Sequence, residues 1–287
     1  MKSGLFKTDL EVVNIGLEMF RNDLVKQGTK VNQVKFLPPA DGDEEVLKAL
    51  DYLDSDPIRR KIEAANKEAV ERIINSRPVL VGYDKAINVI PGMKKNMIIH
   101  AGPPIAWENM CGAMKGAVTG AIVFEGLAGD IEEAEKVAAS GEIEFSPCHE
   151  HSTVGSMAGV TSASMYVHIV ENKTYGNVSY TNLSEQLSKI LRMGANDQSV
   201  IDRLIWMRDV FGPMLKEAME IAGEIDLRLL LSQALHMGDE CHNRNVAGTT
   251  ILIQALSPYL LQTNFSEKDK VDVLNFVASS DYFSGPT

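Results

Sequence analysis

The sequence predicts an α/β fold, with a Rossmann-like N-terminal α/β part, a mixed α+β part and a mainly helical C-terminal part. A strand, a helix and a second strand follow one another within residues 10–37. Further apolar strands alternate with helices as far as residue 183, and helical spacing dominates from residue 184 onward. Hydrophobic residues make up 45% of the 287, so a sizeable core can form, and this length favours more than one domain.

The N-terminal pattern predicts a βαβ unit over residues 1–55, open to completion by later strands. Residues 10–16 have the composition of a short buried strand, and residues 17–27 place apolar side chains at helical spacing before Gly28, a helix stop. Residues 30–37 alternate as a second strand. Only Gly16 stands at the first turn where dinucleotide-binding proteins have G-x-G-x-x-G, so nothing points to a nucleotide or another cofactor.

Residues 56–183 are predicted to form an α/β domain that carries the HAGPPI and PCHEH motifs. Asp130 and Glu133 form a capping box for a helix that Gly141 ends. The other predicted elements are a helix from Asp56 to about residue 76, strands at 77–83 and 97–102, a helix from Trp107 running into a strand at 121–126, a strand at 142–145 and a hairpin at 165–182. Residues 184–287 are predicted to be mainly helical.

Charge and composition exclude several classes of protein. Lys and Arg total 28 against 39 Asp and Glu, a net charge of −11, which disfavours binding to nucleic acid or to anionic membranes. The most apolar stretch contains Lys115 and Glu125, so it predicts no membrane span. Three dispersed cysteines and an N-terminus without a signal-peptide core favour a cytoplasmic location.

The first candidate site is the PCHEH loop, residues 147–151, in which His149 and His151 flank Glu150. Such a loop could bind a metal, use Cys148 as a nucleophile or simply be polar. The spacing matches no zinc signature, and Cys111, Cys148 and Cys241 include no C-x-x-C pair. We therefore expect a polar loop without a metal, and a buried, inert thiol at Cys148.

The second candidate site is the segment MGDECHNRN, residues 237–245, whose flanks are strongly apolar. Buried polar groups need hydrogen-bond partners, so this cluster is either a structural network or a binding site, and we favour the binding site. Arg244 has the geometry to bind a carboxylate or phosphate through two donors. A metal pair at His236 and Glu240 is the weaker alternative. We predict that His149 and Arg244 face one cleft.

Several stretches together resemble the YlbE-like (AllG) family over nearly the whole chain. They are VNIGLEMFRNDLVKQGTKVNQVKFLPPA, HAGPPIAWENMCGAMKGA, FEGLAGDIEEAEKVAASGEIEFSPCHEHSTVGSMAGVTSASM, NLSEQLSKILRMGA and ALHMGDECHNRNVAGT. Two positions depart from the family pattern, in which histidine commonly replaces Glu150 and proline commonly replaces Tyr166. Family members continue past DYFSGPT, so a C-terminal portion is expected beyond this chain.

The resemblance implies a subunit of an oxamate carbamoyltransferase system in anaerobic purine (allantoin) breakdown. That system links oxalurate and phosphate to oxamate and carbamoyl phosphate, so a small anionic substrate is implied. An FdrA-like protein is the implied partner subunit, within a homo- or hetero-oligomer. A non-catalytic ligand-binding or scaffold subunit is the alternative, and a third is a metal-dependent hydrolase using His149 and His151 with Asp239 or Glu240.

Carbamoyl transfer needs cations and N–H donors for phosphate and carboxylate, and a proton acceptor near the attacking nitrogen. The candidate catalytic residues are His149, His151 and Arg244. The candidate substrate-binding residues are Gly102, Lys115, Glu125, Ser152, Asn182, Arg192, Asp239, Glu240, His242, Asn243 and Asn245.

Overall fold

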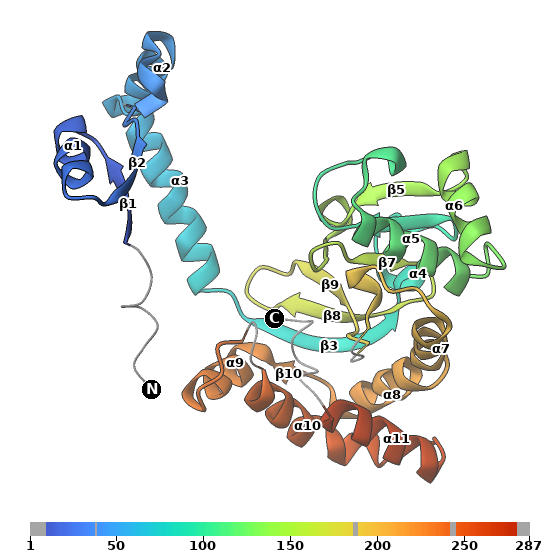
Figure 1. Ribbon diagram of the computed structural model, residues 1–287. Helices are drawn as coiled ribbons and strands as arrows, with labels where there is room; N and C mark the ends of the chain where they lie inside the picture. The colour runs from blue at the N-terminus through green and yellow to red at the C-terminus, as the bar shows by residue number, and fades with distance from the viewer. Residues whose placement is uncertain (1–9, 38, 186–188, 242–244, 280–287) are drawn as a thin grey trace, which may run out of the picture. The chain divides into compact units, whose positions relative to one another are not determined.

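The computed structural model of the chain describes residues 10–37, 39–185, 189–241 and 245–279, and it confirms the predicted mixture of helices and strands (Figure 1). The chain divides into two compact units, residues 1–74 and 75–287. The division lies after Ile74, whereas the sequence placed it after residue 55, because the long helix that follows groups with the N-terminal unit. The rest of the predicted middle part, from Asn75, and the predicted helical part lie together in the second unit.

The N-terminal unit contains the predicted βαβ arrangement, because its two strands pair in parallel with Val13 opposite Asn32 and Ile15 opposite Val34. A helix that the sequence analysis did not identify follows, capped by the Asp43 side chain, which accepts hydrogen bonds from two backbone N–H groups. The elements are β1 (Glu11–Ile15), α1 (Glu18–Lys26), β2 (Lys30–Val34), the 3₁₀ turn η2 (Pro39–Gly42), α2 (Glu44–Leu53) and α3 (Asp56–Ile74).

The second unit contains two sheets. The larger has the strand order β10-β3-β8-β9-β6, antiparallel except for the parallel pair β6–β9, and the smaller has the order β5-β4-β7. In the smaller sheet β4 and β5 are parallel, and β7 is antiparallel to β4. The strands are β3 (Pro78–Lys85), β4 (Met97–His100), β5 (Glu144–Pro147), β6 (Thr153–Val154), β7 (Val160–Ser162), β8 (Tyr166–Asn172), β9 (Val178–Asn182) and β10 (Ile225–Asp226). The predicted hairpin at 165–182 is confirmed as β8–β9.

Helices pack on both sheets of this unit and supply its cores (Figure 1). The C-terminal helices bury one face of the larger sheet, and α5, α6 and α7 bury one face of the smaller sheet. The helices are α4 (Ala86–Val89), η3 (Trp107–Asn109), α5 (Gly112–Phe124), α6 (Ile131–Ser140), η4 (Cys148–His151), η5 (Leu191–Met193), α7 (Gln198–Trp206), the π-helix η6 (Met207–Phe211), α8 (Gly212–Ala222), α9 (Leu227–His236), α10 (Val246–Leu260) and α11 (Glu267–Ala278). In the part of the chain described, no helix is both long and apolar enough to span a membrane.

One predicted element is wrong: residues 121–126 do not form a strand but continue helix α5 to Phe124. The stretch from Ala117 to Ile122 is buried on all sides of the helix. A helix that is apolar all round has no amphipathic period, so its sequence pattern cannot be told from that of a buried strand.

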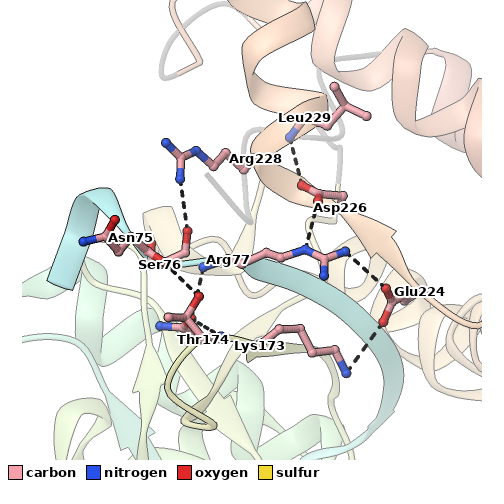
Figure 2. Close-up of polar contacts among 10 residues, drawn as sticks. Asn75, Ser76, Arg77, Lys173, Thr174, Glu224, Asp226, Arg228 and Leu229 are labelled. Carbon is pink, nitrogen blue, oxygen red and sulfur yellow. Dashed lines mark hydrogen bonds and ion pairs between the residues drawn. The ribbon is translucent and has the colours of Figure 1, made fainter. Parts of the chain in front are cut away.

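The first residues of the second unit are fixed to three other segments of that unit (Figure 2). The Thr174 hydroxyl donates to the Asn75 carbonyl at 2.8 Å, and Arg228 donates to the Ser76 carbonyl at 3.3 Å. The Arg77 guanidinium forms ion pairs with Glu224 at 3.6 Å and Asp226 at 3.4 Å. Exposed ion pairs contribute little individually, so the register of β3 depends mainly on its ladder with β8.

Two glycines, which have no side chains, allow helix α5 to lie close to the turn η5. A Cβ at Gly116 would overlap the Gly194 carbonyl oxygen, and a Cβ at Gly194 would lie 2.8 Å from Cα of Ala113. We expect Gly116→Ala to reduce the free energy of unfolding by about 1–3 kcal/mol, because backbone must move to accommodate the methyl group. Gly112→Ala, on the same helix with open space around it, is the control and should cost less than about 0.5 kcal/mol in urea unfolding. Equal values for the two variants would contradict the close contact.

Candidate functional site

A cavity of about 50 Å³ lies beside the end of the smaller sheet. Its walls come from residues between 154 and 160, which lead into β7, from residues 181–185 at the end of β9 and just after it, and from residues 190–192 in and before η5. The parallel strands β4 and β5 end next to it, and the carboxyl ends of parallel strands are where open α/β sheets bind ligands.

Two contacts fix the walls of this cavity. The Asn182 side chain joins β9 to β7, because its amide donates to the Val160 carbonyl at 2.6 Å and its oxygen accepts from the Thr161 hydroxyl at 2.8 Å. Gly155 fits closely, since a Cβ there would lie 3.2 Å from Cys148 Sγ and 3.3 Å from Ala101 Cβ. The predicted residue Asn182 therefore lines the cavity, but both ends of its amide are already engaged within the protein.

The charged groups of the cavity are Glu185 and Arg192. Glu185 Oε2 accepts a hydrogen bond from the Leu191 backbone N–H at 2.6 Å. Burial raises the pKa of the Glu185 carboxyl to about 7, against the opposing effects of the Leu191 N–H and the Arg192 charge. Arg192 Nε is buried and has no hydrogen-bond partner among the described residues. The cavity thus combines a cation with a carboxyl group that gains or loses a proton near neutral pH.

Arg192 was predicted from the sequence, whereas Glu185 was missed. Glu185 lies in the stretch NLSEQLSKILRMGA, where one carboxylate among polar residues gives no sign of burial. Only the fold brings it against Leu191 and Arg192.

A smaller cavity of about 30 Å³ adjoins the first, and both are lined by Asn182, Leu183 and Glu185. Its wall includes Arg208, whose guanidinium lies over the Phe124 ring at 5.6 Å and pairs with Asp209 at 2.7 Å. The predicted residue Glu125, at the end of α5, accepts a hydrogen bond from the Ser164 N–H at 2.7 Å. Glu185 therefore lies between two cavities that each contain an arginine.

The raised pKa of Glu185 predicts how stability depends on pH. The carboxyl has a pKa of about 7 in the folded protein and an ordinary value of 4.5, so it favours the folded state when protonated and loses this contribution as pH rises toward 7. Glu185→Gln removes this titrating group. As pH rises from 5 to 8, the free energy of unfolding of the variant should therefore increase by about 2–3 kcal/mol relative to that of the wild type. Urea unfolding of both proteins across this range measures the difference. A difference that does not change with pH would contradict the raised pKa of Glu185.

The PCHEH loop forms the 3₁₀ turn η4 at the end of β5, and none of its residues is among those lining the cavity. His149 is exposed. His151 is held at both ring nitrogens, with Nδ1 2.6 Å from the Pro91 carbonyl oxygen and Nε2 2.8 Å from the Ser146 hydroxyl. A carbonyl only accepts, so Nδ1 donates to Pro91, and the Ser146 hydroxyl beside Nε2 also donates to Glu150 Oε2 at 3.4 Å. Sequence reasoning missed the Ser146–His151 pair, because neither spacing nor composition indicates it.

Other predicted residues lie around the cavity or away from it. Ser152 caps η4 in the left-handed conformation, and its carbonyl accepts from the Tyr180 N–H at 3.0 Å, two residues before the cavity wall begins. Gly102 is exposed just beyond β4, also in the left-handed region. Lys115 donates to the Glu108 carbonyl at 3.1 Å and lies 5.3 Å from the Trp107 ring centroid, outside the cavity lining.

Burial raises the pKa of the Cys148 thiol to about 12, so it stays protonated and is a poor nucleophile.

The second candidate segment is only partly described. His242, Asn243 and Arg244 lie outside the described residues, and the predicted cleft between His149 and Arg244 therefore stays a prediction. Asp239 is buried and accepts from the Gly248 N–H at 2.7 Å, which stabilises the start of α10, and Asn245 is fully buried at the same helix start. Glu240 is exposed. Within the described ranges, no three His, Cys, Asp or Glu side chains are grouped as metal ligands would be.

Comparisons with known proteins give one family and several relatives. Residues 143–287 match the family described as oxamate carbamoyltransferase subunit AllG. The chain is 66% identical over 287 residues to the Escherichia coli K12 protein named "Uncharacterized protein YahG", and 39% identical over 221 residues, 76% of the chain, to the E. coli K12 protein named "Oxamate carbamoyltransferase subunit AllG". A crystal structure titled as a conserved protein of unknown function from Enterococcus faecalis V583 superimposes with a TM-score of 0.77 and 69% identity over 79% of the chain.

This chain is shorter than each of these relatives. It is matched in full by the YahG protein but spans only 61% of that protein's length. It spans 53% of the AllG subunit and 54% of the E. faecalis chain. The matched family region includes the cavity walls, Glu185 and Arg192.

Proposed function

The chain belongs to the AllG family, and we propose from this that it is a subunit of an oxamate carbamoyltransferase-like enzyme of allantoin and purine catabolism whose cavity binds a small carboxylate anion. The observation that carries the proposal is that Arg192 and Glu185 line the same cavity. An arginine whose Nε has no partner among the described residues has donors for a carboxylate of oxamate or oxalurate, or for a phosphate oxygen.

The same cavity has a group for the proton transfer. When the amide nitrogen of oxamate attacks the carbamoyl carbon of carbamoyl phosphate, the nitrogen must lose a proton and phosphate must leave. A carboxyl group with a pKa near 7 accepts such a proton well at neutral pH, and Glu185 is the described cavity residue with this property. Gly155 and Ser156 line the same space, and we propose their backbone N–H groups as donors to an oxyanion.

The residues predicted from the sequence remain part of the proposal where they fit this site. Asn182 and Ser152 shape the wall, and Gly102 follows the strand end beside it. His149 and Arg244 are proposed to contact substrate or a partner subunit, together with His242 and Asn243. We expect the protein in the cytoplasm, in an oligomer with an FdrA-like subunit.

The experiment has two arms, binding and turnover. Isothermal titration calorimetry of the chain with oxamate, oxalurate, phosphate and carbamoyl phosphate should show binding of at least one carboxylate ligand. Carbamoyl phosphate formation from oxalurate and phosphate is then measured with the chain alone and with the FdrA-like subunit. Turnover only with the partner would support the alternative of a ligand-binding subunit, and the absence of binding to all four compounds would refute the proposed site.

A further inference from the structure

The N-terminal unit has no buried residue of its own among the residues described, 10–37 and 39–74. The unit nevertheless carries many large apolar side chains that are more than two-fifths exposed. They are Leu10, Val13, Ile15, Leu17, Met19, Phe20, Val25, Val34, Phe36, Leu37, Val46, Leu50, Tyr52, Leu53, Ile62, Val70, Ile73 and Ile74. A folded unit of this size normally hides such side chains in a core, so this one lacks something to pack against.

The sheet of this unit is incomplete in two ways. It consists of β1 and β2 alone among the described residues, so the outer edge of each strand offers unpaired backbone groups. One face is also open: Val13, Ile15 and Val34 point to the same side and are 60%, 67% and 44% exposed. Parallel sheets occur almost only with several strands and with both faces covered by helices.

Helix α2 presents a second open apolar surface. Val46, Leu50 and Leu53 recur at the spacing of one helical face and are each more than two-fifths exposed. The helix is properly capped by Asp43, so its exposed stripe belongs to a formed helix rather than to an irregular segment.

We propose that this apolar surface and the free edges of β1 and β2 are the docking site for the polypeptide that the longer relatives carry outside the region matched here, which completes the sheet with further β-α units. The 287 residues are 61% of the YahG protein, so about 180 of its residues lie outside the match, whereas one β-α-β unit takes about 30. That length is enough for the strands and helices that are missing.

A second copy of this chain fits less well. Two copies joined at the same edge around a two-fold axis perpendicular to the sheet would pair antiparallel, and both α1 helices would lie on one face. Val13, Ile15 and Val34 would then remain uncovered. The inference does not depend on the ligand proposed for the second unit.

The test co-expresses the 287-residue chain with the unmatched part of the YahG protein as a separate polypeptide. We expect a 1:1 complex in size-exclusion chromatography with light scattering. Amide hydrogen exchange of residues 11–15 and 30–34 should slow at least tenfold in the complex, because the edges become paired. Exchange in β3 and β8, far inside the second unit, should not change.

The variant Ile15→Lys with Val34→Lys places two charges on the open face at paired positions. It should weaken the complex about 100-fold, because two apolar side chains no longer become buried. Lys61→Gln, at an exposed position of α3, is the matched control and should bind as wild type. Absence of a complex, equal affinity of the double variant, protection already present in the chain alone, or protection that grows with the chain's own concentration would each overturn the inference.

Discussion

Replacing Arg192 by alanine is expected to weaken binding of oxamate or oxalurate about 100-fold, because a carboxylate loses a charge-assisted, two-pronged donor in a partly desolvated cavity. Arg192→Lys should recover only part of the affinity, since an ammonium group keeps the charge but not the planar pair of donors. Calorimetric titration of each purified variant measures the affinities.

The control is Lys189→Ala, which removes a nearby cation that is exposed and paired with Asp197 at 2.9 Å. It does not line the cavity and should change affinity less than twofold. Arg244→Lys belongs in the same series, because the sequence favoured Arg244 as the anion-binding residue. If Arg244→Lys abolishes binding while Arg192→Ala leaves it unchanged, the anion binds at the 237–245 segment and not in this cavity.

Phe211→Ala is expected to lower the free energy of unfolding of the second unit by about 3–5 kcal/mol. The ring is fully buried at the end of the π-helix η6, stacked on Trp206 with centroids 5.5 Å apart and in edge contact with Phe276 at 5.0 Å. Removing it leaves a cavity between α7, α8 and α11 and also ends both aromatic contacts.

Urea unfolding of Phe211→Ala tests this, with Leu261→Ala as the matched control. Leu261 is 55% exposed at the end of α10, so its loss should cost less than about 0.5 kcal/mol. A cost below about 1 kcal/mol for Phe211→Ala would mean that this core is not packed as described.

Local signals predicted much of the fold. The Asp130 half of the capping box is confirmed, since its side chain accepts from the Glu133 N–H at 2.8 Å, whereas the Glu133 side chain accepts from the Gly129 N–H at 2.6 Å; Gly141 ends α6 in the left-handed conformation. The βαβ unit and the hairpin β8–β9 followed from apolar spacing and turn residues. The same kinds of signal could have predicted helix α2, because Asp43 is an N-cap residue and Val46 and Leu50 have helical spacing, but the sequence analysis did not identify it.

The site was harder to predict, because its parts meet only through long-range packing. Glu185 acquires its raised pKa from burial, which no local pattern of charged residues indicates. Likewise, the pairing of His151 with Ser146 and Pro91 depends on how β5 ends beside the turn after α4. The composition of PCHEH, with its cysteine, histidines and glutamate, predicted a site in that segment. The cavity instead is lined mostly by small and apolar residues around two charged side chains.

The most direct test of the proposed site is a crystal structure of this chain grown with oxamate. The ligand should occupy the cavity between the 154–160 loop and η5, with its carboxylate within hydrogen-bond distance of Arg192 and its amide nitrogen toward Glu185. Ligand density at η4 or beside residues 237–245, with the cavity holding only water, would contradict the site.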